Sequence, residues 1–391
     1  MTHKPVLHLL FDDKFIDRAI SQFEEALPGY HYYLLDIPSA DYNIKYVTEY
    51  IDHIDIDIRG SKSYFDKIIA AQPELVILHS MPYFYAHVVN EVLKAQKIIW
   101  IFWGGEVYDY LKEFRNKNFK ERTKQIANRF LIKSRARNFF RTIYFKMKNP
   151  TISWNFSKYA AFKKIDGVAL AHPKEFDTLR NELQLNAQLH WFTYYSIESL
   201  VTNDLKKANI TGNNILVGNS ATLSNNHLDI LYQLKNEISL DNRQLIVPLN
   251  YGEGWYKSLI LKEGDKLFPK NFRALLEFMP LQEYNKIVFS CSVVIMNHLR
   301  QQAVGNLIVS FWIGAKVFLD EMNPLFDYFK RIGLIVFSIQ KDLAEIQINE
   351  SLTSLDIEKQ QSVLLAHYQS SNVIHATRLM LEAYLHETLR Q

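Results

Sequence analysis

The sequence has almost no cysteine. Of its 391 residues, one is a cysteine, Cys291. A single thiol excludes a scaffold held by disulfides and a cysteine-rich metal site, and it fits a reducing compartment.

Long apolar runs are also missing. The most apolar run, Leu307–Ala315, has nine residues and is bounded by Asn306 and Lys316, whereas a membrane-spanning helix needs about 20 apolar residues. The short N-terminal run Val6–Phe11 stops at Asp12, so we expect no signal peptide. The sequence therefore predicts a soluble, cytoplasmic protein whose membrane contact, if it has any, is peripheral.

Net charge is nearly absent as well, because 45 basic residues face 42 acidic ones, for a formal charge of +3. The distribution is uneven: residues 112–148 carry 13 basic and two acidic side chains, so the rest of the chain is acidic. This pattern excludes a uniformly basic coat for nucleic acid. With 48% hydrophobic and 14% aromatic residues, the chain has enough apolar surface to fold.

Short apolar runs alternate with segments of helical spacing, which indicates parallel sheets covered on both faces. The length predicts two domains, and the fold class is α/β: two Rossmann-like domains facing a central cleft. We place an N-terminal domain at 1–200, a second domain at 201–361 and a helical tail at 362–391, with the polar stretch 202–214 as linker. The predicted strands are Val6–Phe11, His31–Leu35, Leu75–Leu78, Ile98–Trp103, Val168–Ala171, Ile215–Val217, Gln244–Pro248, Val293–Met296 and Lys316–Leu319.

Familiar catalytic signatures are missing. The sequence contains no HExxH, no Walker loop, no GxGxxG and no nucleophile elbow. The acidic pair Asp55 and Asp57 lies in an alternation typical of a half-exposed strand. We therefore expect no bound metal.

Two loops of the second half carry polar residues directly after a predicted strand. The loop 218–227 is rich in hydroxyl and amide side chains and leads into a helix, whose N-terminus favours an anion such as a diphosphate; ordinary helix capping explains it equally well. The loop 297–306 places Arg300 before a helix, where a guanidinium can neutralise phosphate oxygens, and Gly305 allows close backbone approach. A solvated surface arginine is the alternative.

In the first half, Glu106 follows the glycine pair of Trp103–Tyr108, Asp12 and Asp13 end the first strand, and His79 ends another. One of these groups is expected to act as general base for a sugar hydroxyl. Helix capping by the aspartates and burial of the imidazole are the competing interpretations.

Within the basic segment 112–148, apolar residues from Ala136 to Met147 recur at helical spacing, while Arg137, Arg141 and Lys148 lie elsewhere on the helix. This composition is typical of an interfacial membrane anchor. A helix packed on the domain and a nucleic-acid surface are the alternatives.

Taken together, these loops resemble glycosyltransferase family 56, the bacterial 4-acetamido-4,6-dideoxygalactose (Fuc4NAc) transferases that act on lipid-linked saccharides. The resemblance rests on Ile215–Ser220 with Ser224, Asn225 and His227, on Val247-Pro248 with Tyr251, on Arg300-Gln301-Gln302 with Gly305, on Asn323-Pro324, and on Trp103-Gly104 with Tyr108. The chain differs from the family pattern in carrying Glu106 for an aspartate and Ala303 for a glycine.

The resemblance implies a GT-B fold and metal-independent, inverting transfer from a dTDP-sugar to a polyprenyl-diphosphate-linked acceptor. It also implies that the enzyme needs no cofactor, works on the cytoplasmic face of the inner membrane and has no nucleic-acid partner. Asp13, Glu106 and His79 are then the candidate catalytic residues, and Arg137, Phe140, Arg141 and Tyr144 the membrane or acceptor contacts. The expected donor-binding residues are Gly218, Asn219, Ser220, Ser224, Asn225, Asn226, His227, Tyr251, Arg300, Gln301, Gln302, Gly305 and Asn323. Two alternative hypotheses remain. The enzyme could use another UDP-, GDP- or dTDP-sugar donor for capsule or O-antigen assembly, or the chain could be a non-catalytic protein that binds the membrane surface.

Overall fold

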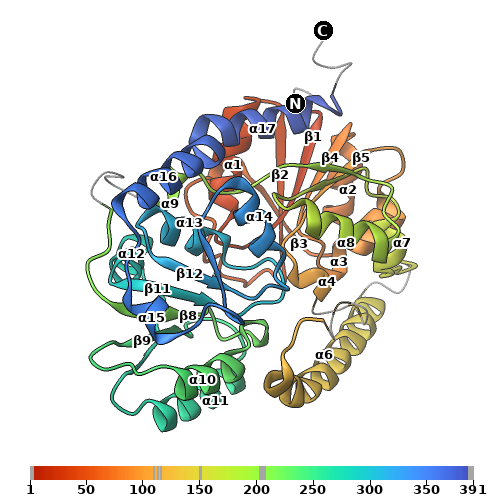
Figure 1. The fold of residues 1–391 in the computed structure, drawn as a ribbon. Helices are drawn as coiled ribbons and strands as arrows, with labels where there is room; N and C mark the ends of the chain where they lie inside the picture. Colours follow the sequence, from red (N-terminus) through yellow and green to blue (C-terminus); the bar gives the residue numbers. More distant parts are fainter. Residues whose placement is uncertain are drawn as a thin grey trace. The chain divides into compact units, whose positions relative to one another are not determined.

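A computed structural model describes residues 4–108, 111, 114, 117–148, 152–201 and 208–385, without the side chains of 128–138, 142, 148, 345 and 346. The chain forms two compact units (Figure 1). Unit 1 consists of residues 1–106, 136–195 and 371–391, and unit 2 of residues 107–135 and 196–370. Each unit contains one parallel β-sheet, so the predicted α/β class is confirmed.

Unit 1 has a seven-stranded sheet in the order β3-β2-β1-β4-β5-β6-β7. Its central strands are continuous apolar runs that are buried on both faces, as expected when helices cover a parallel sheet. The strands are β1 (Val6–Phe11), β2 (His31–Ile37), β3 (Asp55–Ile58), β4 (Leu75–His79), β5 (Lys97–Ile101), β6 (Gly167–Ala169) and β7 (Gln188–His190). The helices are α1 (Ile16–Ala26), α2 (Lys62–Ala71), α3 (Tyr83–His87), α7 (Lys158–Phe162), α8 (Pro173–Leu183) and α17 (Ser370–Glu382), with short turns at η1 (Ile51–His53) and η2 (Val88–Val92).

Unit 2 has a six-stranded sheet in the order β10-β9-β8-β11-β12-β13. Its strands are β8 (Asn214–Val217), β9 (Leu245–Pro248), β10 (Phe272–Leu275), β11 (Cys291–Met296), β12 (Lys316–Leu319) and β13 (Val336–Ser338). The helices are α9 (Ile197–Val201), α10 (His227–Glu237), α11 (Gly254–Leu267), α12 (Leu281–Phe289), α13 (Val304–Trp312), α14 (Pro324–Ile332), α15 (Glu345–Asn349) and α16 (Ser354–Tyr368), with the turn η4 (Leu223–Asn225).

The strand order of each sheet reverses beside its first strand. In unit 2, β8 pairs with β9 on one side and with β11 on the other, so the connections after β8 and β11 leave on opposite sides. In unit 1, β1 lies in the same way between β2 and β4. Doubly wound sheets bind ligands at such a reversal, outside the carboxyl ends of the strands.

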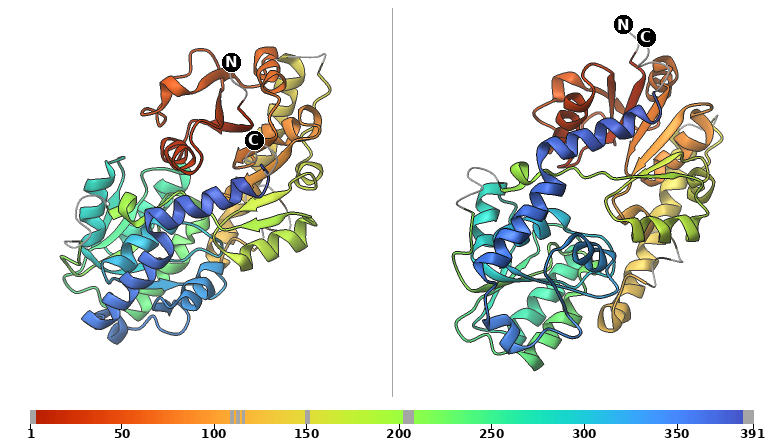
Figure 2. Two further views of the ribbon diagram at one scale, coloured as in Figure 1. Left: turned by 90° about the horizontal axis from the view of Figure 1, so that it is seen from above. Right: turned by 45° about the horizontal axis from the view of Figure 1, so that its top comes forward.

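The end of the chain returns to unit 1. Gln22 of α1 donates to the Thr377 hydroxyl of α17 at 2.8 Å, and Tyr384 lies 2.9 Å from His190 of β7. Figure 2 shows α17, in dark blue, beside segments of unit 1. The last helix is therefore an integral part of the first sheet's covering.

Two further helices are α4 (Gly105–Tyr108), which precedes the basic segment, and α6 (Glu121–Lys148), which lies within it. The helix predicted between residues 136 and 147 is confirmed as the final turns of α6. Residue ranges 109–110, 112–113, 115–116 and 202–207 lie outside the described residues, and with them part of the predicted linker 202–214. Among the described residues, no helix combines the length and apolarity needed to cross a bilayer.

Candidate functional site

The loops after β8 and β11 of unit 2 meet through two asparagines. Asn226 Nδ2 donates to the Asn297 carbonyl at 3.0 Å, and Asn297 Nδ2 donates back to the Asn226 carbonyl at 3.2 Å. Asn226 is also the N-cap of α10, in the left-handed conformation with φ +50°, which an asparagine adopts more readily than most residues. The reciprocal amides hold the two loops in one arrangement.

Asn225 joins the same loops a second time. Its Oδ1 accepts from Asn219 N at 2.8 Å and faces His298 Nε2 at 2.8 Å, so His298 carries its proton on Nε2. Gly218 has φ +68°, and a Cβ there would lie 2.6 Å from both Asn225 Oδ1 and His227 Nε2. Only glycine leaves room for this contact.

A third bridge runs through Gln302. Its Oε1 accepts from the Ser224 hydroxyl at 2.7 Å, and its Nε2 donates to Asn219 Oδ1 at 2.9 Å. Asn219 Nδ2 in turn donates to the hydroxyl of Tyr251, whose side chain is 44% exposed. Most of the predicted donor-binding residues of the two loops thus form one network, with Tyr251 at its exposed edge.

Several polar atoms of this network are buried and have no hydrogen-bond partner among the described residues. Arg300 is 8% exposed, donates from Nη1 to the Gln301 carbonyl at 3.1 Å and leaves Nε unpaired. The other unpaired atoms are Gln301 Oε1, His298 Nδ1, Asn297 Oδ1 and both ring nitrogens of His227. Buried polar groups without partners are rare in folded proteins and often mark a site whose ligand supplies the missing bonds.

The electrostatics of this cluster favour an anion. Burial lowers the pKa of His227 to about 3, and burial together with the nearby Arg300 charge lowers the pKa of His298 well below its usual value. Both imidazoles are therefore neutral at pH 7, and Arg300 remains a cation, 5.8 Å from the Tyr108 ring centroid. A buried guanidinium beside neutral donors is suited to diphosphate oxygens.

The remaining predicted donor-binding residues are Ser220, Gly305 and Asn323. Ser220 is buried and accepts from Asn225 Nδ2 at 3.2 Å, and Gly305 is in the first turn of α13. Asn323 follows β12 and caps α14 by accepting from Leu325 N at 3.0 Å, with its Nδ2 unpaired in the described part. Ala303 has φ +59°, a conformation that favours the glycine found at this position in the family pattern.

Three members of this network were not predicted as site residues: Thr222, Asn297 and His298. Thr222 Oγ1 accepts from Asn225 Nδ2 at 2.8 Å and lies 3.3 Å from Gln302 Nε2. Their position in the sequence was the signal that could have identified them, because all three lie in the two loops that follow adjacent strands.

In unit 1, Asp12 and Asp13 at the end of β1 have different surroundings. Both carboxylate oxygens of Asp12 are used: they accept from the Tyr42 hydroxyl and from the backbone of residues 45–47, at 2.8 to 3.2 Å. Asp13 accepts from Phe15 N at 3.2 Å. Burial raises the pKa of Asp13 to about 6, which is near the value wanted in a general base at neutral pH.

Glu106 and His79 are more deeply enclosed than Asp13. Glu106 Oε1 accepts from Trp100 Nε1 at 3.1 Å and from Trp103 N at 2.9 Å, and burial raises its pKa. His79 Nδ1 lies 3.0 Å from the Tyr194 hydroxyl, and burial lowers its pKa to about 3. These contacts fix the backbone and rings around the end of β5.

His79 belongs to a buried chain of imidazoles. His79 Nε2 lies 3.0 Å from His8 Nδ1, and His8 Nε2 lies 2.9 Å from His31 Nδ1. Trp103 Nε1 donates to the Tyr194 hydroxyl at 3.1 Å, which closes the chain at the carboxyl end of the sheet. No pattern in the sequence links these three histidines, which come from β1, β2 and β4.

The predicted membrane contacts lie on α6. Phe140 is 66% exposed, Tyr144 and Arg141 are also exposed, and the side chain of Arg137 lies outside the described part. Phe145 is 7% exposed and packs its ring 5.1 Å from Trp154 and 5.6 Å from Phe84. The helix is thus attached to unit 1 by Phe145, and the aromatic face predicted from the spacing is open to solvent.

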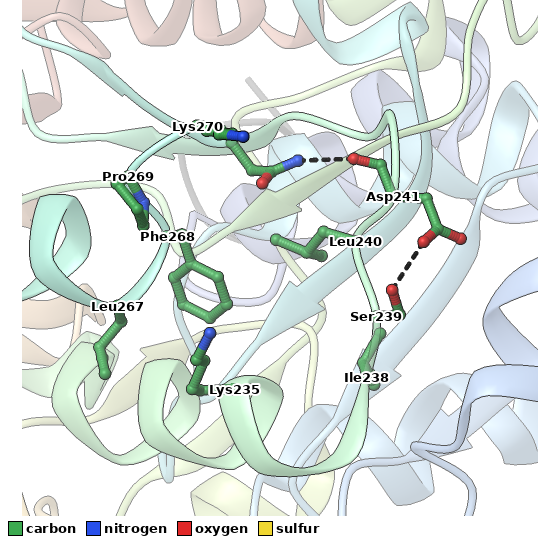
Figure 3. Close-up of a pocket in the computed structure, with 10 residues that line it drawn as sticks. Lys235, Ile238, Ser239, Leu240, Asp241, Leu267, Phe268, Pro269 and Lys270 are labelled. Atoms are coloured by element: carbon green, nitrogen blue, oxygen red, sulfur yellow. Dashed lines mark hydrogen bonds between the residues drawn. The ribbon is translucent and has the colours of Figure 1, made fainter.

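A pocket of about 290 Å³ lies by the amino ends of β9 and β10, at the end of the second sheet opposite to the two polar loops (Figure 3). Asn271 donates to the Asp241 carbonyl at 3.0 Å across its rim. It contains none of the predicted site residues. In the described part of the chain, no three His, Cys, Asp or Glu side chains are grouped for a metal ion.

Several solved structures share this fold over nearly the whole chain. Sucrose-phosphate synthase from Thermosynechococcus elongatus is 10% identical, with a TM-score of 0.62 over 99% of both chains. Anabaena HepE, solved with UDP and glucose, is 10% identical, with a TM-score of 0.61 over 97% of this chain and 100% of that one. A glycosyltransferase from Rickettsia africae is 11% identical, with a TM-score of 0.60 over 99% of both. The fold is therefore GT-B.

A family model described as 4-alpha-L-fucosyltransferase, glycosyl transferase group 56, matches residues 174–377, which is more than half of the chain. The matched range contains both loops of the polar network and Asn323, and it confirms the resemblance seen in the sequence. The chain belongs to glycosyltransferase family 56 and is a nucleotide-sugar glycosyltransferase with a GT-B fold.

Proposed function

We propose that this enzyme moves a deoxy-amino sugar of the Fuc4NAc type from a dTDP-sugar to a saccharide linked to polyprenyl diphosphate, with inversion and without a metal. Unit 2 binds the donor and unit 1 supplies the base and receives the acceptor. The observation that carries the proposal is the buried cation Arg300 among unpaired polar atoms at the strand reversal of unit 2. HepE, of the same fold, is described in complex with UDP and glucose, which supports a nucleoside diphosphate as the ligand of this unit.

The reaction is a direct displacement at the anomeric carbon. The acceptor hydroxyl oxygen forms the new bond to that carbon, its proton passes to the Asp13 carboxylate, and the bond to the diphosphate breaks. Arg300 and the N–H groups of the β8 and β11 loops stabilise the charge that develops on the leaving diphosphate. Asp13 is the proposed base because it is less completely buried than Glu106 and His79 and has a raised pKa, while Glu106 and His79 are proposed to hold the surrounding rings.

The lipid-linked acceptor accounts for α6. Phe139, Phe140 and Met147 are 64%, 66% and 77% exposed, and the helix carries basic residues on the same exposed stretch. Such a surface inserts apolar rings between anionic headgroups, to which each basic residue adds about 1 kcal/mol. We propose that α6 docks on the cytoplasmic face of the inner membrane, where the polyprenyl anchor holds the acceptor.

The donor proposal is tested by thermal shift with dTDP, UDP and GDP. A ligand present at 100 times its Kd stabilises the folded protein by about 2.7 kcal/mol, so binding is measurable as a rise in Tm. We expect dTDP to give the largest rise, and Arg300→Gln to abolish it. Arg243→Gln is the matched control, because Arg243 is an arginine of the same unit that is half-buried and bonds to Ile348 and Asn349.

A larger response to UDP or GDP would replace the donor and keep the enzyme class. If none of the three nucleotides raises the Tm of the wild type, the donor site does not lie in this network. Equal loss of the response in both arginine variants would assign the effect to general destabilisation.

A further inference from the structure

Asp13 lies at the edge of a cluster of aromatic rings in unit 1. Phe15, two residues further on, stacks on Tyr194 at 5.6 Å with 7° between the ring planes, and it meets Trp103 edge-on at 5.3 Å. Phe11, the last residue of β1, lies 5.1 Å from the Trp103 ring. Phe11, Phe15 and Trp103 are half-buried, so each residue keeps part of its surface open to solvent.

The rings are held from behind by hydrogen bonds that leave them little freedom. Trp103 donates from its backbone to Glu106 and from its indole to the Tyr194 hydroxyl, which continues into the buried chain His79–His8–His31. A polar network buried in this way fixes the orientation of the groups attached to it. A surface that is rigid before binding loses little conformational entropy when a ligand arrives.

The chemistry of the cluster restricts its ligand. A phosphate would be repelled by the Asp13 carboxylate, and a hydrocarbon chain would bury that carboxylate without a partner. A pyranose ring suits both groups, because its C–H bonds pack on the negative faces of aromatic rings while a hydroxyl donates to the carboxylate. Lys14, whose ammonium lies 5.0 Å from the centroid of Phe15, is the nearby cation and reaches this surface from the same loop.

We propose that Trp103, Phe15 and Phe11 form the binding surface for the terminal sugar ring of the acceptor, beside Asp13. The inference rests on the proposed function, and it adds the group that positions the reacting hydroxyl. Trp103 and Phe15 contact the C–H face of the sugar, and the ring's hydroxyl edge meets Asp13. Tyr194 acts only through Trp103 and is a positioning residue.

The test uses soluble sugars, because they bind without the lipid. Saturation-transfer NMR is recorded on the full chain with a panel of methyl hexopyranosides and methyl N-acetylhexosaminides. In the wild type we expect transfer to the C–H protons of at least one sugar. Trp103→Leu and Phe15→Leu should weaken that binding at least tenfold, while Trp103→Phe, which keeps a ring, should retain most of it.

Tyr50→Leu is the matched control, because Tyr50 is a half-buried aromatic of the same unit whose ring contacts His53. No transfer to any sugar, or equal loss in Trp103→Phe and Trp103→Leu, would overturn the proposal. Competition by geranyl phosphate but not by sugars would assign the surface to the lipid instead. The dTDP thermal shift is measured in the same variants: if it persists while sugar binding is absent, this inference fails and the donor proposal stands.

Discussion

Two neighbouring aspartates, identical in chemistry, are separated by their surroundings in this protein. Asp12 accepts four hydrogen bonds and anchors the segment around residues 42–47, whereas Asp13 accepts from Phe15 N in its own loop and has a pKa raised by burial. The sequence suggested capping or catalysis for both. Only the folded loop shows that the Asp12 carboxylate is used for structural hydrogen bonds.

Asp13→Asn should lower turnover at least about 100-fold and leave the dTDP-induced shift in Tm unchanged, because the amide cannot take the acceptor proton. The wild-type kcat/KM should fall as pH drops below about 6, where the base becomes protonated. The measurement is a pH–rate profile on lipid-linked acceptor. Asp12→Asn is the control and should lower stability while keeping the same acidic limb; turnover retained in Asp13→Asn would remove Asp13 as the base.

Asp13→Asn should lower turnover but raise the stability of the folded protein at neutral pH. Between about pH 4 and 6 the folded protein holds the Asp13 proton that the unfolded chain releases, so this group lowers the free energy of unfolding as pH rises through that window. Asp13→Asn should therefore have a higher Tm than the wild type at pH 7.5 and a similar one at pH 4. Differential scanning calorimetry at both values checks this, and a lower Tm at pH 7.5 would contradict the raised pKa.

Among the elements, α6 begins with a cap supplied by another helix. Asp229 of α10 accepts from Arg122 N at 2.8 Å, from Thr123 N at 3.1 Å and from the Thr123 hydroxyl at 2.7 Å. Asn226, which joins the two donor loops, accepts from Lys120 N at 2.9 Å just before the helix. The start of the basic helix is thus attached to the donor network of unit 2.

Asp229→Ala should cost about 1–2 kcal/mol of stability and expose the first N–H groups of α6. Hydrogen exchange measures this, and we expect faster exchange in residues 121–124. Thr353→Ala removes the capping box of α16 in the same unit and serves as the control, with faster exchange confined to α16. Unchanged exchange at the start of α6 in Asp229→Ala would show that the carboxylate is not its cap.

The end of α6 is where membrane binding is expected. Reversing Arg137 and Arg141 to glutamate should weaken binding to anionic liposomes at least about 20-fold, because each basic residue near such a surface contributes about 1 kcal/mol. Activity on lipid-linked acceptor should fall with it. Lys262→Glu with Lys266→Glu reverses two charges on α11 and should leave flotation unchanged; equal binding of all variants would make α6 an ordinary solvated helix.

The predicted strands match the structure where the apolar runs are long and buried. The strands of both sheet centres were recognised, but β7, β10 and β13, of three or four residues, were not. These strands lie at or next to a sheet edge and are less completely buried, as in Phe272–Leu275, so their hydrophobic pattern is weak.

At the scale of the whole molecule, many histidines are buried and neutral. Burial lowers the pKa of His79, His172 and His227 to about 3 and that of His31 to about 4, and the pKa of His8 and His298 lies well below the usual value. The unfolded chain takes up protons on these side chains below about pH 6.5, whereas the folded chain does not. Stability is therefore fully present above pH 6.5 and is lost as pH falls.

We expect the urea midpoint to drop clearly between pH 7.5 and pH 5, because the unfolded chain takes up protons on these histidines and the free energy of unfolding falls. Asp13 opposes this trend, but it is one group against several. Urea unfolding followed by fluorescence at the two pH values is the measurement. A midpoint that does not change would show that these imidazoles are protonated in the folded state.

The amino-acid sequence by itself determined the fold class, the positions of the two polar loops and the basic amphipathic helix, because each of these depends on local periodicity and on residues close together in the chain. Tertiary structure alone decided which side chains share a site. The pairing of β8 with β11 brings Asn225 to His298, and the pairing of β1 with β2 and β4 aligns three histidines behind Trp103. Burial sets the charge state of these groups, and burial is a property of the packed chain.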